Sequence, residues 1–195
     1  MSTPAIESIS LILFAYLLGS LSSAILLSRL MGFPDPRTDG SNNPGATNVL
    51  RIAGKKAAFF TLLGDCLKGL VPVLVAQWMT DDHLVIALTG FSAFLGHCFP
   101  LYFNFKGGKG VATAIAVNVA FNWLTGAIII AVWLLFAKVF RISSLAAIIS
   151  FAALPLLIYW QEASLAITGI FSLMSAILIW RHKANIQRLL QGRES

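Results

Sequence analysis

The sequence predicts an all-α, polytopic membrane protein with about seven transmembrane helices, organised as a single domain over residues 1–195. Hydrophobic residues make up 57% of the chain and charged residues only 11%, with a mean hydropathy of +0.81. A water-soluble domain does not have this composition. Several apolar runs also reach the roughly 18 residues that a helix needs to cross a bilayer. Finally, the Lys and Arg residues gather between these runs, as they do in cytoplasmic loops.

Five apolar runs are clear spans: residues 9–31, 57–79, 84–103, 143–160 and 164–180. The first is a retained span rather than a signal peptide, because no basic residue precedes it and Arg29 follows where a cleaved signal has small residues. Residues 111–137 are apolar and carry no formal charge, but Asn118, Asn122 and Gly126 interrupt them. This segment crosses the membrane either once or twice.

Charge favours two short crossings by residues 111–137. All 14 Lys and Arg residues except Lys68 lie outside the spans or at their ends, and two crossings place all of these on one side. The acidic residues of the opposite connections are Glu7, Asp81, Asp82 and Glu162. A single crossing would instead leave Lys138, Arg141 and the basic tail outside. The positive-inside rule therefore predicts seven crossings, with the N terminus outside and the C terminus in the cytoplasm.

Two cysteines and one oppositely charged pair lie inside the spans. Cys66 and Cys98 are interpreted as small buried residues rather than as a disulfide or metal site. Asp65 and Lys68 are spaced i, i+3, so they can neutralise each other on one helix face; a proton or substrate relay is the alternative. The basic charge is explained by topology and anionic lipid, and no nucleic-acid motif is present.

Residues 32–56, GFPDPRTDGSNNPGATNVLRIAGKK, form the first of three polar stretches. They are too rich in Gly, Pro, Asn and Asp to be helical for much of their length. Ser41, Asn43, Thr47 and Asn48 offer uncharged hydrogen-bonding groups, and Arg51 offers a bidentate partner for an oxyanion. The length of the stretch favours a binding loop over a simple solvated connector.

The second stretch, residues 96–113, reads GHCFPLYFNFKGGKGVAT. Lys106, Gly107, Gly108 and Lys109 precede a predicted helix, whose first amides and dipole favour a phosphate. The pattern lacks the features of an ATP-binding Walker loop, and a basic turn is the alternative. His97, near the end of its span, is either a general base or a hydrogen-bonded structural group.

The third stretch, residues 181–194, reads RHKANIQRLLQGRE. In a helix, Arg181, Asn185 and Arg188 share one face, and His182 also shares a face with Asn185. This polar side can close over the other two stretches. A basic tail that only sets topology is the alternative.

Together, GSLSSA with the loop through GSNNPGATNVLR, then GHCFPLYFNFKGGKGVAT and then RHKANIQRLLQG resemble the three motifs of the bacterial acyl-phosphate:glycerol-3-phosphate acyltransferases. The resemblance spans nearly the whole chain in order. It implies acyl transfer from acyl phosphate to the 1-hydroxyl of sn-glycerol 3-phosphate, which forms lysophosphatidic acid and phosphate in phospholipid biosynthesis. It also implies a bacterial inner membrane location with a cytoplasmic active site. No cofactor or metal is expected, and the oligomeric state is left open.

Within this resemblance, the expected catalytic residues are Ser41, His97, Lys109 and His182. The expected phosphate-binding residues are Asn43, Thr47, Asn48, Arg51, Lys106, Gly107, Gly108 and Asn185. No histidine is followed five residues later by Asp, so the His-Asp dyad of other glycerolipid acyltransferases is absent. The proton acceptor is therefore left open between His97, His182 and the leaving phosphate.

Chemistry alone leaves two alternatives open. A phosphate or organophosphate transporter would also use broken helices and cations, but it would place them near the middle of the membrane. Acyl-CoA and acyl carrier protein are also possible donors, and only the resemblance selects acyl phosphate.

Overall fold

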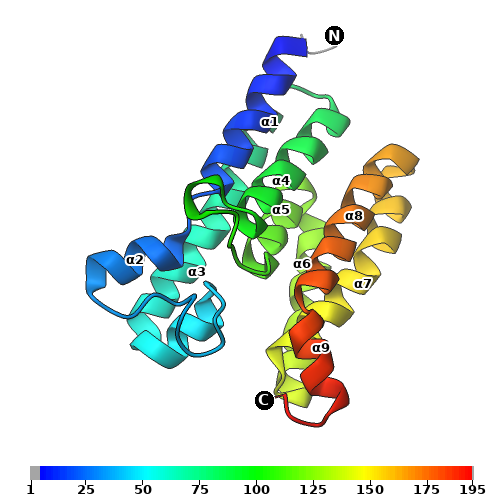
Figure 1. Cartoon of the computed structure of the whole chain (residues 1–195). Helices are drawn as coiled ribbons and strands as arrows, with labels where there is room; N and C mark the ends of the chain where they lie inside the picture. Colours follow the sequence, from blue (N-terminus) through cyan, green and yellow to red (C-terminus); the bar gives the residue numbers. More distant parts are fainter. Residues whose placement is uncertain (1–4, 195) are drawn as a thin grey trace.

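The computed structural model describes residues 5–194, which form helices and loops without any strand (Figure 1). The helices are α1 (Ala5–Gly19), α2 (Ser23–Met31), α3 (Ala46–Met79), α4 (His83–Cys98), the 3-10 turn η1 (Leu101–Phe103), α5 (Val111–Phe121), α6 (Trp123–Phe140), α7 (Ser143–Glu162), α8 (Leu165–Arg181) and α9 (Lys183–Leu190). Five segments are long and apolar enough to cross a membrane, and the bent α8–α9 pair makes a sixth. The predicted all-α membrane fold is confirmed, whereas the count of seven crossings stays a prediction. The helix that is missing from this count is α5, which at 11 residues is only about 16 Å long.

Two predicted spans are broken in the structure. Residues 111–137 divide at Asn122, whose side-chain oxygen accepts hydrogen bonds from the backbone amides of Leu124 and Thr125 and so caps α6. The predicted two-part form of this segment is confirmed. Residues 9–31 also divide, between α1 and α2, where we had expected one continuous helix. Lys68 of α3 donates a hydrogen bond to the Leu21 carbonyl in this break, which is a contact that the local sequence does not reveal.

Helix α1 packs closely against α4 through glycines. A Cβ atom on Gly19 would lie 2.2 Å from the Ala93 carbonyl oxygen, and one on Gly96 would lie 2.4 Å from that of Tyr16. Small residues let membrane helices approach each other this closely. Elsewhere the buried core is built from large apolar side chains such as Phe94 and Phe151, while many other large apolar side chains face outward, as expected beside lipid.

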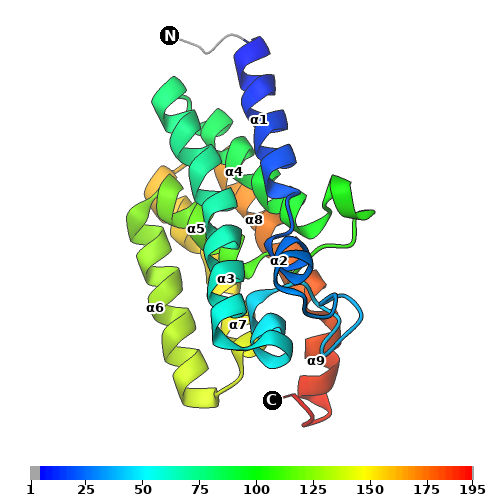
Figure 2. The ribbon, with the colours of Figure 1, turned by 90° about the vertical axis from the view of Figure 1, so that its left-hand side faces the viewer.

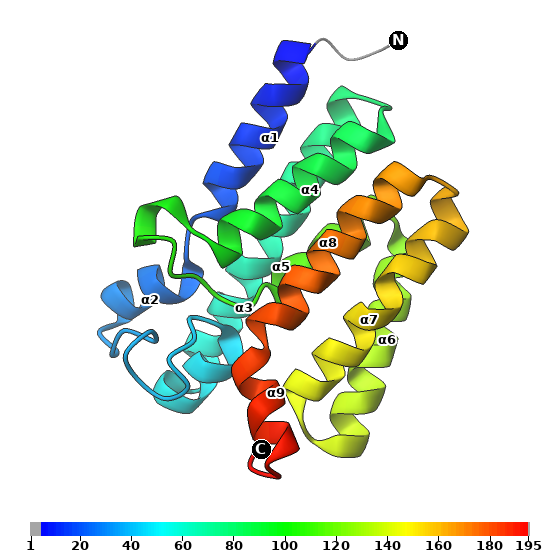
Figure 3. The ribbon, with the colours of Figure 1, turned by 45° about the vertical axis from the view of Figure 1, so that its right-hand side comes forward.

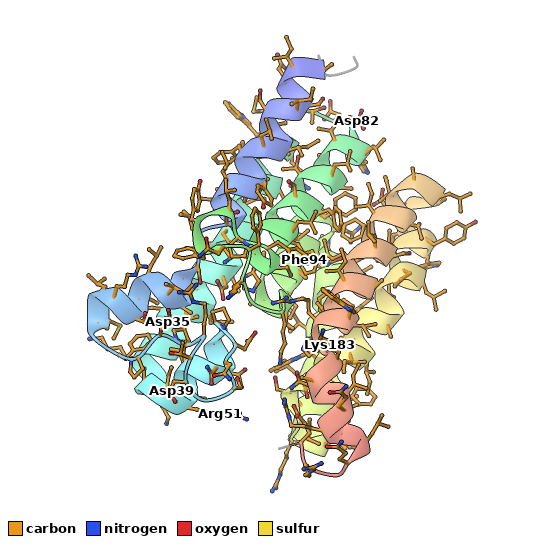
Figure 4. The ribbon with its side chains drawn as sticks, in the orientation of Figure 1. Asp35, Asp39, Arg51, Asp82, Phe94 and Lys183 are labelled. Carbon is orange, nitrogen blue, oxygen red and sulfur yellow. The ribbon has the colours of Figure 1, made fainter. Side chains whose placement is uncertain are left out.

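The loops separate into two ends of the bundle. The start of α1, the α3–α4 turn and the α7–α8 turn lie at one end (Figures 1 and 3). The loop of residues 32–45, the α6–α7 turn and α9 lie at the other end, so the two chain termini are far apart (Figures 2 and 3). Asp82 and Arg51 mark these two ends (Figure 4). The first and third polar stretches therefore lie toward the end where the chain finishes, and the η1 loop of the second stretch lies between the two ends (Figure 1).

Candidate active site

Asn48 is buried in the first polar stretch, where its side chain hydrogen-bonds to three backbone groups of the loop. Its side chain is 1% exposed, and its amide nitrogen donates to the carbonyl oxygens of Pro36 (3.0 Å) and Asp39 (2.9 Å). Its oxygen accepts a hydrogen bond from the Ser41 backbone amide at 2.8 Å. Both amide hydrogens are therefore occupied in this conformation. Asn48 therefore shapes the loop and holds the Ser41 amide, and its expected role in phosphate binding stays a prediction.

A cation–π contact of Arg37 connects this loop to the second stretch. The Arg37 guanidinium binds the Asp35 carboxylate (2.7 Å) and lies 6.0 Å from the centre of the Phe103 ring in η1. The hydrogen bond from Arg37 holds the pKa of Asp35 below its usual range. Beyond this contact, the loop continues to the start of α3, where the expected phosphate-binding residues are exposed or half-buried: Ser41, Asn43, Thr47 and Arg51.

Arg181, at the end of α8, hydrogen-bonds to the glycine loop of the second stretch (residues 106–110). Its Nη2 donates to the Gly107 carbonyl (2.6 Å) and its Nε to the Gly108 carbonyl (3.1 Å), while the guanidinium lies over the Phe99 ring. The Gly108 amide, which we expected to bind phosphate, donates instead to the His97 carbonyl at 3.2 Å. Sequence analysis gave Arg181 no role in the site. The available signal was the helical face that it shares with Asn185.

The second and third stretches meet at Lys109 and Asn185. The Lys109 ammonium donates to the Asn185 side-chain oxygen, and the Asn185 amide donates to Glu194. Glu194 also accepts hydrogen bonds from Ser144 (2.7 Å) and Arg188 (2.6 Å). Glu194 was likewise missed as a site residue, because nothing in the sequence shows that the end of the chain folds back onto α7 and α9. Lys106 lies on the exposed part of the same loop.

Positive charge accumulates around Lys109. The pKa of Lys109 is lowered to about 8: burial lowers it most, Glu194 raises it, and the neighbouring Arg188, Arg181 and Arg51 lower it. We call Arg51, Lys109, Arg181 and Arg188 the cationic cluster. Burial raises the pKa of Glu194, but hydrogen bonds from Asn185 and Arg188 lower it more, so this carboxylate stays charged. Four cations near one carboxylate favour a phosphate dianion.

Both candidate histidines are buried beside this cluster. His182 is 2% exposed, and its Nδ1 donates to the Leu178 carbonyl at 2.8 Å, which leaves the lone pair on Nε2. The His97 ring lies beneath the glycine loop, where a Cβ atom on Gly108 would lie 2.2 Å from Nε2. The catalytic roles of the two histidines stay predictions. Among residues 5–194, no group of His, Cys, Asp and Glu side chains is arranged to hold a metal ion.

Comparison with known proteins supports one family. The model of the family described as Glycerol-3-phosphate acyltransferase matches residues 9–192. The glycerol-3-phosphate acyltransferase of Methylococcus capsulatus is 51% identical over 187 residues, which cover 95% of this chain and 93% of the relative. That of Halorhodospira halophila is 50% identical over 185 residues, which cover 95% and 94%.

Solved structures agree with the sequence comparisons. The crystal structure of PlsY (YgiH), an integral membrane glycerol 3-phosphate acyltransferase, in its glycerol 3-phosphate form is 38% identical, with a TM-score of 0.91. The match covers 97% of this chain and 94% of that chain. The lysophosphatidic acid form of PlsY has a TM-score of 0.88 at the same identity. The chain therefore belongs to the glycerol-3-phosphate acyltransferase family.

Proposed function

We propose that this chain transfers a fatty acyl group from acyl phosphate to the 1-hydroxyl of sn-glycerol 3-phosphate, and that it releases lysophosphatidic acid and phosphate. The observation that carries the proposal is the cationic cluster, which gathers charges from α3, the glycine loop and the α8–α9 region in a member of this acyltransferase family. Both substrates carry phosphate, so a cationic site suits each of them. The experiment is an assay of phosphate release from palmitoyl phosphate with and without glycerol 3-phosphate.

The related structures support this pair of substrate and product. PlsY has been solved in a glycerol 3-phosphate form and in a lysophosphatidic acid form, and both share this fold over 97% of the present chain. Glycerol 3-phosphate is the acceptor and lysophosphatidic acid is the acylated product of the proposed reaction. Acyl phosphate as the donor rests on the motifs of the three stretches.

In the proposed reaction, the acceptor hydroxyl oxygen attacks the acyl carbon. The new ester bond forms as the bond between the acyl carbon and the phosphate oxygen breaks, and inorganic phosphate leaves. Ser41, Arg51 and Lys109 hold the two phosphates, so that the hydroxyl lies against the mixed anhydride. The cations also stabilise the charge that develops on the departing phosphate. Because an acyl phosphate is already activated, no covalent enzyme intermediate is required.

The hydroxyl proton ends on the released phosphate in this scheme, either directly or through a histidine. His182 has a geometry that suits the indirect route, because its Nδ1 contact leaves a lone pair on Nε2. Burial and the nearby Lys109 lower the pKa of His182 to about 4, so it is a weak base at neutral pH. The direct route requires only the leaving phosphate. Replacement of each histidine separates the two routes.

We further propose seven membrane passes, with the N terminus outside and the active site facing the cytoplasm of a bacterial inner membrane. Successive helices α1, α3, α4, α5, α6, α7 and α8 alternate in direction, and the chain ends lie at opposite ends of the bundle (Figure 1). The basic α9 lies at the proposed cytoplasmic end, as the positive-inside rule requires. Single cysteines placed at Asp81 and Arg141 test this topology. A membrane-impermeant thiol reagent added to intact cells should label the first and not the second.

The transporter alternative loses support. A transporter would hold its substrate near the middle of the membrane, whereas the cationic cluster draws on loops and helix ends. The relatives and solved structures that match almost the whole chain are glycerol-3-phosphate acyltransferases.

A further inference from the structure

A buried ion pair on α3 lies beneath the glycine loop. The Asp65 and Lys68 side chains are 3% and 5% exposed, and Lys68 Nζ lies 2.9 Å from Asp65 Oδ1. The same carboxylate oxygen lies 3.6 Å from His97 Nδ1 on α4. The distance is too long for a hydrogen bond, but the two groups face each other inside the bundle.

Lys68 also contacts the break between α1 and α2, and the α3 backbone at Asp65 contacts α5. Lys68 donates a hydrogen bond to the Leu21 carbonyl in the break between α1 and α2, at 2.9 Å. The Asp65 carbonyl accepts one from the Thr113 hydroxyl, at 2.9 Å, just after the start of α5. Because α2 leads to the Ser41 loop and α5 follows the glycine loop, this part of α3 is joined to both proposed phosphate-binding segments.

Mutual neutralisation does not by itself explain this pair. Charges inside a membrane protein are costly, and two apolar residues of similar volume are often at least as stabilising as a buried ion pair. Neutralisation explains why Lys68 accompanies Asp65. It does not explain why the Asp65 carboxylate faces His97.

His97 contacts the glycine loop directly through both its backbone and its ring. Its carbonyl accepts the Gly108 amide at 3.2 Å. A Cβ atom on Gly107 would lie 2.1 Å from that carbonyl oxygen, and one on Gly108 would lie 2.2 Å from His97 Nε2. The two glycines therefore lie directly on His97, so a shift of the His97 ring or backbone moves the loop that carries Lys109.

We infer that Asp65 and Lys68 are positioning residues for acyl transfer: the pair holds His97 beneath Gly108 and fixes the break at Leu21, and so sets the distance between the two phosphate-binding segments. This inference rests on the proposed function. Displacement of reacting groups by about 1 Å can cost on the order of a hundredfold in rate. Loss of the pair should therefore slow turnover more than it weakens substrate binding.

The test compares wild type with the double variant Asp65→Asn/Lys68→Gln, which removes both charges and leaves neither one unpaired. Thr89→Val is the matched control, because Thr89 is a buried polar residue of α4 that bonds only within its own helix, at Val85. We would measure kcat, the KM for glycerol 3-phosphate and the thermal unfolding midpoint in lipid nanodiscs. The double variant should lose about tenfold or more in kcat with less than about a threefold change in KM. Thr89→Val should stay within about twofold of wild type in both parameters.

A second variant keeps the test decisive if the double variant does not fold. Asp65→Glu keeps the charge pair but moves the carboxylate by one methylene relative to His97, and it should also lower kcat without lowering the unfolding midpoint. If folded variants turn over within about twofold of wild type, the pair only neutralises charge and the inference is overturned. An inactive wild type would instead count against the proposed function itself.

Discussion

The Lys109 ammonium donates a hydrogen bond to the Asn185 side-chain oxygen, across 76 residues of sequence. This bond joins the glycine loop to α9, and the second bond of Asn185 carries the connection on to Glu194. The same burial that orders Lys109 lowers its pKa to about 8. The charge of the central cation should therefore be lost within the ordinary range of enzyme assays.

The KM for glycerol 3-phosphate should rise above pH 8. A lysine with a lowered pKa is charged below that pKa and becomes neutral as the pH rises through it, here near 8 rather than 10.5. The substrate phosphate stays a dianion over this range, since its second pKa is about 6. Measured between about pH 7 and 10, the KM of wild type should increase by about tenfold per pH unit above 8.

Lys109→Arg is the matched control for this pH profile. Arginine stays protonated at every pH of the assay, so the KM of this variant should be flat where that of wild type rises. Lys109→Ala should show a severe loss of kcat/KM at all pH values. A wild-type KM that does not change between pH 7.5 and 9.5 would contradict the assignment of Lys109 as a phosphate-binding cation.

Arg181→Lys should lower kcat/KM by about tenfold or more, because an ammonium cannot reproduce the two hydrogen bonds that the guanidinium makes to successive carbonyls. Lys183→Ala is the control, since it removes a neighbouring exposed cation that lies over the Trp180 ring. Steady-state kinetics of the two variants would separate loop geometry from net positive charge. Near-wild-type kinetics of Arg181→Lys together with a loss in Lys183→Ala would mean that only charge matters.

Asn48→Ala should release the Ser41 loop while leaving the helix bundle folded. The variant loses three hydrogen bonds, each worth about 1 kcal/mol, outside the apolar core. We expect kcat/KM to fall by at least about tenfold while the helix content stays unchanged. Thr38→Ala removes one exposed hydrogen bond from the same loop and should stay close to wild type. Normal kinetics for Asn48→Ala would show that loop order is not required.

Single alanine variants of the two histidines distinguish the routes of the hydroxyl proton. If His182 Nε2 is the base, His182→Ala should lose about a hundredfold or more in kcat. His97→Ala should disturb the glycine loop and lower kcat through geometry, as the Asp65 variants do. Near-normal turnover of both variants would exclude a histidine base and leave the proton transfer to the leaving phosphate.

Much of the fold follows from the sequence because hydropathy decides which segments enter a bilayer. Asn122 was one of three residues expected to interrupt the apolar run, and in the structure it caps α6. The division between α1 and α2 was not predicted. Lys68, which contacts this break, lies on another helix and is distant in sequence.

The prediction of the site residues has the same limit, because contacts between distant residues leave no local pattern. The three polar stretches identified Lys109 and Asn185, because glycine-rich basic loops and polar helical faces leave local patterns. Asn48 and Arg181 bind backbone carbonyls of distant residues, and no residue type or spacing reveals such contacts in advance. Glu194 joins the site only because the chain end folds back onto Ser144 and Arg188.

The most direct test of the proposed function is phosphate release by the purified protein in lipid, with palmitoyl phosphate as donor and the lipid product identified by mass spectrometry. The account predicts release that depends on glycerol 3-phosphate and yields one lysophosphatidic acid for each phosphate. Absence of turnover with palmitoyl phosphate, and equally with acyl-CoA and acyl carrier protein donors, would contradict the proposed acyl transfer.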